Sequence, residues 1–354
     1  LSEGFALRGH QVKVLTSRWG ILPRAESPRK GLDIQRIFAF RKSADHCTPA
    51  RMAAFALLAA PRAVGVAMNF LPDVVHCHFA VPVAPVGWFV RLIERVPFIV
   101  TMHGGDVPGH QPQETDAWFR WIRRPMGFIL RKAFACAAVS HHLAERARQG
   151  YGLPEVLEIP NGVDSDFFNP RGAPSPRRDN RIRCVFAGRF SPEKTLHVLL
   201  EAIAMVKNKF GLDVHLSLVG AGPEEQNLRR RIQELGLGFC VAVTGWVPRE
   251  MVAGALHSSD IFVLPSRIEG MPMACLQAMA AGLPIVASRN PGALEVVREG
   301  ENGIFAPVGD AAALADGIAR LAGDPEMRRR MAARSREIAW ADFRWDVIID
   351  RYLD

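Results

Sequence analysis

The sequence lacks any paired spacing of cysteines. Its 354 residues contain six cysteines, none of them in a Cys-x-x-Cys arrangement, and most stand among apolar neighbours. Disulfide-stapled secreted domains and zinc modules use clustered cysteines, so this pattern argues against both classes. We therefore expect the cysteines to be small core residues of a protein in a reducing, cytoplasmic compartment. We expect no metal site.

Long apolar runs are also lacking. A helix that spans a bilayer needs roughly 20 apolar residues, and no uninterrupted run reaches that length. The most apolar tract, residues 52–90, is interrupted by Arg62, Asp73 and several prolines. No signal peptide, solenoid repeat or low-complexity tract is visible. These absences favour a globular protein over an integral membrane protein.

Two ligand-binding signatures are missing as well. No Gly-x-Gly-x-x-Gly follows a visible first strand with an acidic residue about 20 positions later, which argues against a dinucleotide-dependent oxidoreductase. The basic residues show no recognition-helix arrangement, so we expect no nucleic-acid partner.

The composition is that of an ordinary globular protein with an uneven charge. Apolar residues make up 49% of the chain and charged residues 23%. Residues 1–171 hold 21 Lys and Arg against 14 Asp and Glu, whereas residues 172–354 hold 23 against 22. A basic first half suggests an anionic partner, such as a phosphorylated substrate or an acidic membrane face. A solvated basic surface without any partner is the alternative.

Short apolar runs alternate with helical patterns along the whole chain, which is typical of parallel sheets covered by helices. The length predicts two domains. We expect an α/β protein with two Rossmann-like domains that face a central cleft: a first domain (residues 1–168), a Pro- and Gly-rich linker (169–180) and a second domain (181–337). Residues 2–8 resemble a helix that a strand and a Gly-rich loop should precede, and we expect that these are missing from the chain. Predicted strands cover residues 11–17, 74–79, 98–103, 136–140, 156–160, 183–187, 214–219, 240–244, 261–264, 285–287 and 303–306.

The most informative segment is residues 265–284. A buried-type strand enters a glycine-containing turn and then a helix, with Pro272 expected near the first helical position. The free amides of such a helix start, with the positive end of its dipole, form a seat for phosphate. Glu269 stands at the mouth of the turn and Gln277 lies about two helical turns further on. This pattern predicts that backbone amides hold a pyrophosphate and that side chains hold a polyhydroxyl group, as in a nucleotide-sugar.

Two cations follow the first strand of the second domain. Arg189 and Lys194, after Gly188, suit a diphosphate leaving group because a guanidinium fork and an ammonium neutralise its charge. A solvated turn in which Glu193 pairs with one of them is the alternative. Glycines such as Gly220 end other strands and let the backbone approach a ligand. The backbone of Trp246 or Val247 is a candidate frame for a nucleobase.

The first domain has a polar strand end of its own. His103, Gly104 and Asp106 follow a buried-type strand, and we expect both polar side chains to point into the cleft. His76 and His78 share one face of another strand. A histidine is often only a structural hydrogen-bonding group, and that interpretation is favoured for His76 and His78.

Two basic segments are candidates for contact with an anionic membrane. Residues 116–134 mix Trp and Phe with Arg and Lys, as interfacial helices do. The alternative is an amphipathic helix packed on the domain, whose basic face is only hydrated. The segment 24–42 is a second candidate for binding a membrane or an acceptor.

Taken together, these residues resemble the family-4 glycosyltransferases of the GT-B fold. The resemblance covers nearly the whole chain and rests on motifs in the family's order. These are Ile159-Pro-Asn-Gly-Val-Asp164 with Phe168, Gly188-Arg189 with Pro192-Glu-Lys194, and Glu269-Gly-Met-Pro272 at the family's Glu-x7-Glu spacing. Residues 340–352 are similar to the terminal helix that returns to the first domain, so we assign residues 338–354 to it.

This resemblance implies retaining, metal-independent transfer from a nucleotide-diphospho-sugar to a glycan or lipid-linked acceptor. It makes residues 1–168 the acceptor-side domain and residues 181–337 the donor-binding domain. It assigns Arg189 and Lys194 to the diphosphate, and Glu269 with the amides of Gly270 to Met273 to the sugar. Position 277 would contact the ribose, and His103 would lie beside the anomeric carbon. The enzyme would be cytoplasmic, or peripheral on the membrane.

One residue departs from the family pattern. The second Glu of the motif is Gln277, and an amide offers one acceptor oxygen where a carboxylate offers two. We expect weaker or altered ribose binding with the chemistry retained. A non-catalytic nucleotide-sugar-binding protein of the same fold is the alternative hypothesis.

Overall fold

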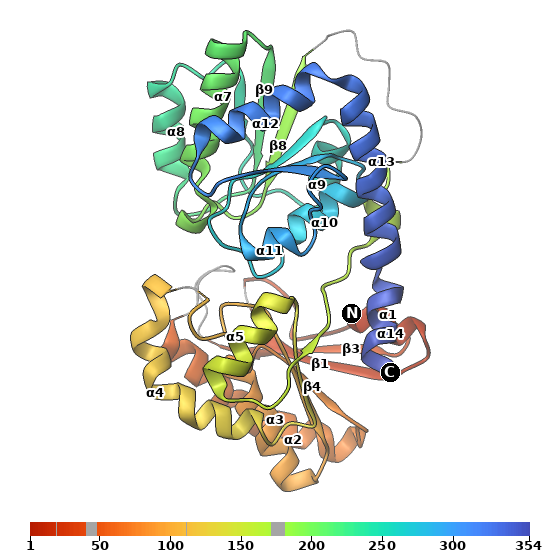
Figure 1. Ribbon diagram of the computed structural model, residues 1–354. Coiled ribbons are helices and arrows are strands. Elements are labelled where there is room, and N and C mark those ends of the chain that lie inside the picture. Colours follow the sequence, from red (N-terminus) through yellow and green to blue (C-terminus); the bar gives the residue numbers. More distant parts are fainter. Residues whose placement is uncertain (19, 40–47, 111, 171–180) are drawn as a thin grey trace. The chain divides into compact units, whose positions relative to one another are not determined.

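The computed structural model describes residues 1–18, 20–39, 48–110, 112–170 and 181–354, with the side chains of 112–118 left out. The chain divides into two compact units, residues 1–160 with 349–354, and residues 161–348. Figure 1 shows both units in the colours of the sequence. The predicted linker, residues 169–180, lies almost wholly outside the described residues.

The first unit contains two sheets. One has the order β1-β3-β2, from Val12–Arg18, Leu32–Phe38 and Ala25–Arg29, with β1 and β3 parallel and β2 antiparallel to β3. The other is parallel and has the order β4-β5-β6-β7, from Val75–His78, Phe98–Met102, Ala135–Ala138 and Leu157–Glu158. The sequence patterns predicted five of these seven strands and missed β2 and β3.

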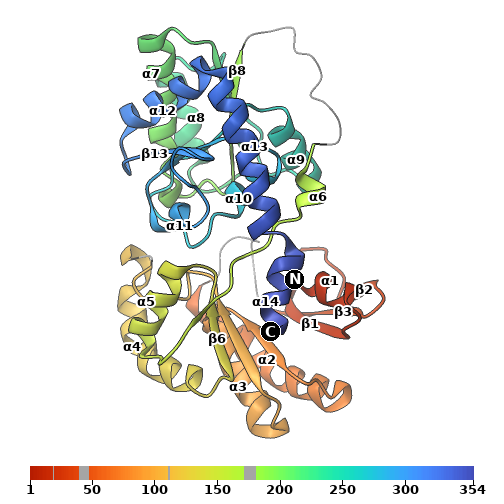
Figure 2. The same cartoon turned by 45° about the vertical axis from the view of Figure 1, so that its right-hand side comes forward.

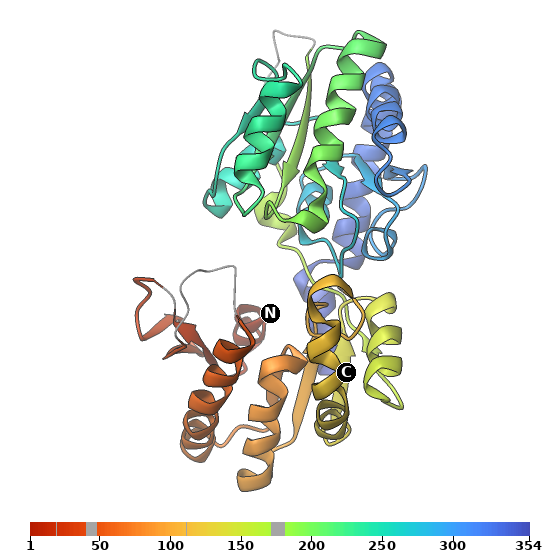
Figure 3. The same cartoon turned by 90° about the vertical axis from the view of Figure 1, so that its left-hand side faces the viewer.

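Three helices of the first unit lie side by side, as Figure 3 shows: α2 (Pro49–Phe70), α3 (Ala80–Glu94) and α4 (Pro112–Leu130). Helix α5 (His141–Tyr151) packs against β6 and β7. Among the described residues, α2 is the one helix whose length and composition would allow it to cross a membrane, with a mean hydropathy of 1.5. The search for uninterrupted apolar runs missed it because Arg51, Pro61 and Arg62 break the run without breaking the helix.

The second unit is a single parallel sheet with helices on both faces. Its order is β10-β9-β8-β11-β12-β13, from Val241–Val243, Val214–Val219, Ile182–Ala187, Ile261–Leu264, Ile285–Ser288 and Gly303–Ala306. Every residue of β11 and β12 is buried, which explains their continuous apolar sequence. Helices α7 (Leu196–Phe210), α8 (Glu225–Glu234) and α12 (Ala311–Gly323) pack together, and α10 (Met273–Ala280) packs on α13 (Pro325–Asp342). Helix α9 (Arg249–His257) packs against β8 and β9.

The boundary between the units differs from the expected position at residue 168. Residues 161–168, which include α6 (Ser165–Phe168), belong to the second unit because they bond to it. The amide of Val163 donates to the Phe343 carbonyl over 2.7 Å, and Asp164 forms an ion pair with Arg249 over 2.8 Å. Residues 161–168 therefore form part of the connection between the chain and the second unit.

The chain end also divides differently from the expectation. Of the terminal residues assigned to the first domain, only 349–354 belong to it, and residues 338–348 pack with the second unit. Helix α14 (Trp345–Leu353) brings its last turns beside α1 (Ser2–Leu7), as Figure 2 shows. There Arg8 pairs with Asp350 over 2.6 Å, and the ring of Tyr352 packs edge-on against Phe5.

Candidate active site

The predicted donor-binding residues gather where the order of the second sheet reverses. Strand β8 lies between β9 and β11, so the loops that follow β8 and β11 leave the sheet in neighbouring positions. In open α/β sheets this reversal opens a crevice at the carboxyl ends of the strands, and ligands bind there. The first loop carries Gly188, Arg189 and Lys194, and the second carries Glu269 and Gly270.

Hydrogen bonds join these two loops directly. The amide of Arg267 donates to the Glu193 carbonyl over 2.8 Å, and the hydroxyl of Thr195 donates to the Pro265 carbonyl over 2.6 Å. Thr195 has a left-handed φ of 43°, a strained conformation for a β-branched residue. The bond to Pro265 offsets part of that strain and fixes the start of α7 beside the loop after β11.

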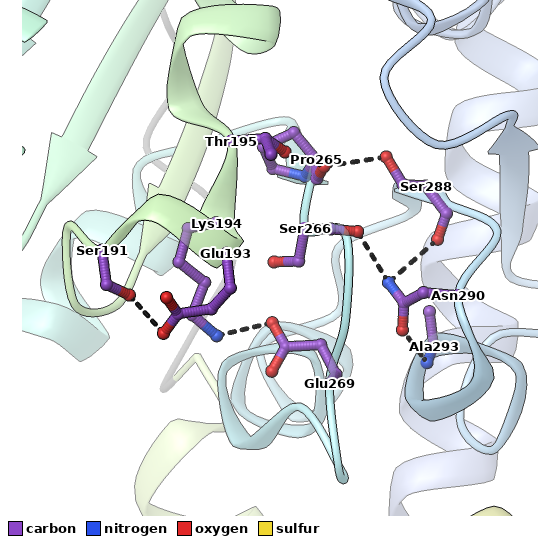
Figure 4. A network of polar contacts seen from close by, with 10 residues as sticks. All are labelled: Ser191, Glu193, Lys194, Thr195, Pro265, Ser266, Glu269, Ser288, Asn290 and Ala293. Atoms are coloured by element: carbon purple, nitrogen blue, oxygen red, sulfur yellow. Dashed lines mark hydrogen bonds and ion pairs between the residues drawn. The ribbon is translucent and has the colours of Figure 1, made fainter. Parts of the chain in front are cut away.

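The joined loops bring Lys194 and Glu269 into contact. Their Nζ and Oε1 atoms are 2.6 Å apart, and Figure 4 shows the two side chains reaching toward each other from opposite loops. The lysine side chain is 19% exposed and the glutamate side chain 9%. Glu193 accepts a hydrogen bond from the Ser191 hydroxyl over 2.5 Å, and the carboxylate that meets Lys194 is that of Glu269. An ammonium and a carboxylate thus occupy one small, water-poor site.

Asn290 supports the Glu269 loop, and the sequence analysis missed it. Its amide nitrogen donates to the carbonyls of Ser266 over 2.9 Å and Ser288 over 3.2 Å, and its oxygen accepts from the Ala293 amide over 3.0 Å (Figure 4). A Cβ on Gly292 would lie 2.4 Å from the Glu269 carbonyl oxygen, so only glycine allows this approach. The signal was present in the sequence, because Asn followed by Pro291 is a typical helix start.

The amides at the start of α10 face the same region without a side-chain cap. Pro272 is the N-cap residue, with ψ of 95°, and stands directly before the first helical residue, which confirms its predicted position near the helix start. Helix geometry leaves the amides of Met273 and Ala274 without helical partners. Gly270 and Met271 form the turn before them, and Met271 Sδ accepts from the Asn161 amide over 3.1 Å. This helix start can therefore bind an anion.

The neighbouring strand ends come into close backbone contact. A Cβ on Gly220 would lie 2.0 Å from the Gly188 oxygen, and the Gly220 amide donates to the Gly245 carbonyl over 3.0 Å. Trp246 is exposed, and Val247 beside it is half-buried.

Two further predicted donor-site residues, Arg189 and Gln277, are both half-buried. Arg189 lies on the loop after β8, and Gln277 lies on α10.

The first unit holds the other predicted group, His103, at the end of β5. Its Nε2 lies 3.1 Å from Nδ1 of His78, and the His78 ring stacks on His76 with centroids 4.2 Å apart. Nε2 of His76 bonds to Oγ1 of Thr101 over 2.8 Å. The sequence analysis treated His76 and His78 as structural, and it missed that His78 orients His103.

The sequence analysis expected the Asp106 side chain to point into the cleft, but the structure buries it. The residue is 2% exposed, and its carboxylate accepts hydrogen bonds from three backbone amides. These amides are those of His103 and Gly104, over 3.0 Å each, and of Ala80 over 2.6 Å. A buried carboxylate must be satisfied in this way, so Asp106 shapes the loop that carries His103 and Gly104. Burial raises the pKa of Asp106, against the opposing effect of those amides.

The histidine group is held neutral. Burial lowers the pKa of His76 to about 3 and those of His78 and His103 to about 4, and the neighbouring histidines add repulsion for His76 and His78. At neutral pH His103 is therefore an uncharged imidazole, which can donate or accept a hydrogen bond but carries no charge.

This burial predicts a pH-dependent stability. The unfolded histidines bind protons near pH 6.5 and the folded ones only near pH 4 or below, so the unfolded state binds more protons in between. The free energy of unfolding should stay level above pH 6.5 and fall as the pH drops toward 4. Urea unfolding at several pH values measures this, and His76→Gln should reduce the slope. Equal slopes in the variant and the wild-type protein would contradict the buried neutral state.

Comparisons with known proteins identify the family of this chain. Residues 172–338 match the family described as glycosyl transferases group 1, and residues 1–167 match glycosyltransferase family 4. A phosphatidyl-myo-inositol mannosyltransferase of Mycobacterium leprae is 33% identical over 79% of this chain and 72% of its own. A sucrose-phosphate synthase structure from Thermosynechococcus elongatus superposes with a TM-score of 0.81 at 22% identity, over 99% of this chain and 89% of that one. The Anabaena protein HepE, solved with UDP and glucose, gives a TM-score of 0.72 at 20% identity, over 91% and 85%. The chain belongs to the family-4 glycosyltransferases and has their GT-B fold.

Proposed function

We propose that this glycosyltransferase moves a sugar from a nucleotide-diphospho-sugar, with uracil or guanine as its base, to a glycan or lipid-linked acceptor with retention of configuration. The observation that carries the proposal is the contact of Lys194 with Glu269 beside the uncapped start of α10. The structure of HepE with UDP and glucose, and the phosphatidylinositol named as acceptor of the mycobacterial relative, support the donor and acceptor classes.

In this proposal the donor diphosphate binds between Arg189, Lys194 and the amides of residues 270–273. Glu269 exchanges its contact with Lys194 for hydrogen bonds from the sugar hydroxyls. Gly220, Trp246 and Val247 surround the base, and Gln277 contacts the ribose. We propose that the transfer needs no metal ion, since two cations and the helix dipole stabilise the charge on the departing diphosphate.

The proposed step keeps all bonding on one face of the sugar. The bond from the anomeric carbon to the phosphate oxygen breaks, and the acceptor hydroxyl attacks the same face within the resulting ion pair. Its proton passes to the departing phosphate oxygen, so a nucleoside diphosphate and the new glycoside are the products. Neutral His103 lies on the acceptor side, where it would hydrogen-bond to the sugar and carry no charge toward the positive anomeric carbon.

A non-catalytic nucleotide-sugar-binding protein is the second candidate, because Gln277 departs from the family's glutamate. The two functions differ in one measurement. Release of labelled sugar from UDP- or GDP-sugars, by hydrolysis or transfer, indicates the enzyme, whereas binding without release indicates the binding protein.

Removal of Lys194 should lower turnover more than about a hundredfold, because one fixed donor to the developing charge is commonly worth that much. Lys194→Ala also leaves Glu269 buried without its partner, which destabilises a protein by roughly 3–5 kcal/mol. The double variant Lys194→Met with Glu269→Gln removes both charges and should recover stability but not turnover. Donor turnover and urea unfolding, measured on the same samples, separate the two effects.

Lys209→Ala is the matched control, since Lys209 is an exposed lysine that contacts Asp316 over 3.8 Å and the ring of Phe210 over 5.0 Å, both at the surface. It should leave turnover and stability close to those of the wild-type protein. Full turnover of a folded Lys194→Ala variant would remove this lysine from the proposed mechanism.

Gln277→Glu should strengthen donor binding several-fold, because a carboxylate accepts hydrogen bonds from both ribose hydroxyls. The expected change is a lower KM for the donor with kcat nearly unchanged, since position 277 contacts the end of the donor that does not react. Calorimetric titration with the nucleoside diphosphate checks the binding directly. An unchanged or weaker affinity would show that residue 277 does not contact the ribose.

We also propose that the protein works in the cytoplasm, at an anionic membrane surface, through the outer face of α4. Phe119 and Met126 on this helix are buried, whereas Trp121 is 84% exposed and Phe128 lies outside beside Lys132. Exposed aromatic and basic side chains on one helix are typical of interfacial binding. The alternative left open by the sequence is a packed helix whose outer, basic face is only hydrated, and vesicle binding distinguishes the two.

Trp121→Ala with Phe128→Ala should therefore weaken binding to vesicles of phosphatidylcholine and phosphatidylglycerol about tenfold or more, because each aromatic buries apolar area in the membrane. Sedimentation with vesicles measures the bound fraction. Phe239→Ala, at an exposed aromatic of the second unit, should bind as the wild-type protein does. Equal binding by all three proteins would contradict this surface.

A further inference from the structure

The first unit contains a cavity that the proposed donor chemistry does not use. It has a volume of about 710 Å³ and lies between the strand ends of β1, β2 and β3 and the flank of α2. Four arginines line it, Arg18, Arg24, Arg36 and Arg62, and the described residues contribute no acidic side chain to its lining. A second cavity of about 230 Å³ shares Arg62 and adds Lys13. The basic segment 24–42, a candidate for binding a membrane or an acceptor, therefore contributes to a cavity rich in positive charge.

Three of the four arginines are held at the cavity by contacts that leave most of the positive charge unbalanced. Nε of Arg18 donates to the Leu22 carbonyl over 3.0 Å, and Arg62 donates to Oε1 of Gln35 over 3.0 Å. Both acceptors are neutral. Arg36 pairs with Glu26, the carboxylate that offsets one of the four charges. The cavity is thus a preformed concentration of guanidinium groups.

Like charges that share one cavity repel one another, so an anion that enters it is attracted by all of them. The chemistry of the group favours a phosphate. A guanidinium presents parallel N–H donors that match two phosphate oxygens, and such paired bonds are among the strongest in proteins. A carboxylate would engage one or two arginines, whereas the tetrahedral oxygens of phosphate can reach several.

The rim of the cavity is apolar, which limits the class of ligand further. Phe38 and Leu58 line the cavity, and Phe38 is 61% exposed although it is a large aromatic. Leu22, whose carbonyl binds Arg18, is also exposed. Apolar side chains beside a charged cavity suit a molecule with a phosphate at one end and hydrocarbon at the other.

The position of the cavity fits a substrate site. Arg18 is the last residue of β1, and Phe38 is the last residue of the parallel strand β3. Ligands of α/β sheets bind at the carboxyl ends of parallel strands. The acceptor-side domain would therefore present the arginines at the edge of the sheet where chemistry occurs.

We propose that this arginine pocket, formed by Arg18, Arg24, Arg36 and Arg62, binds the phosphate group of the acceptor, and that the acceptor is an amphiphilic phosphate. The inference rests on the proposed glycosyl transfer and deepens it, because it names the chemical class of the acceptor. The phosphate binds the arginines, and the hydrocarbon lies against Phe38 and Leu58.

The test is a ³¹P NMR titration of the full chain with two probes, inorganic phosphate and dihexanoyl phosphatidate below its micelle concentration. The pocket variant is Arg24→Gln with Arg62→Gln, which spares Arg36 and its ion pair. The matched control is Arg329→Gln with Arg330→Gln, two exposed arginines of α13 that remove the same charge. The pocket variant should bind both probes about tenfold more weakly or worse, since charge-assisted bonds are lost, and the control should bind as the wild-type protein does.

The two probes separate the sources of the phosphate. Tighter binding of the phosphatidate than of inorganic phosphate, with the difference reduced by Leu58→Ala, supports the amphiphile. Equal affinity for both probes would overturn the amphiphilic part and indicate a soluble phosphorylated acceptor. Equal loss of binding in the pocket variant and the control, or no loss in either, would overturn the pocket altogether.

Donor hydrolysis without acceptor keeps this inference distinct from the proposed function. The Arg24→Gln, Arg62→Gln variant should hydrolyse the donor at the wild-type rate, because both residues lie outside the donor site. A protein that binds phosphate in the pocket but never turns over a donor would refute the proposed enzyme and leave the pocket standing.

Discussion

The contact between Lys194 and Glu269 is the interaction on which the donor site depends. Each charge is nearly removed from water, and either one alone would be costly to bury. The pair is tolerable because two loops, bonded to each other through Thr195 and Arg267, hold the partners in place. A bound diphosphate would offer Lys194 a stronger partner and release the carboxylate for sugar hydroxyls. In the proposed function, the same buried pair would thus exchange its internal contact for contacts with a charged ligand.

The first unit also buries a carboxylate, and there backbone amides take the place of an opposite charge. Asp106 is buried among three amide donors and fixes the turn after β5. That turn directs His103 toward His78, and burial keeps both imidazoles neutral at physiological pH. Asp106 and His103 both look catalytic in the sequence. In the structure Asp106 positions the loop, and His103 is the side chain that this loop positions.

Much of the fold could be predicted because its signals are local. Strand β11 matched its predicted bounds, since four consecutive apolar residues between polar turns describe a buried parallel strand. Strands β2 and β3 were missed because they are rich in charge and half-exposed, so no clear periodicity marks them. The apolar length of helix α2 was missed for a different reason. Arg51, Pro61 and Arg62 interrupt the apolar run in the sequence, although the helix continues through them.

The sequence by itself determined the family, the succession of strands and helices and the residue types at the strand ends, because motif spacing and apolar periodicity are properties of neighbouring residues. It also marked Arg189, Lys194 and Glu269 as donor-site candidates. Only the tertiary structure decided which of these meet. Lys194 and Glu269 are 75 residues apart, and Asn290 and Gly292 fit beneath the Glu269 loop from a third strand end. Arg18 and Arg62 likewise share a cavity only because α2 folds back over β3. Contacts of this kind depend on sheet order and packing, which no local pattern encodes.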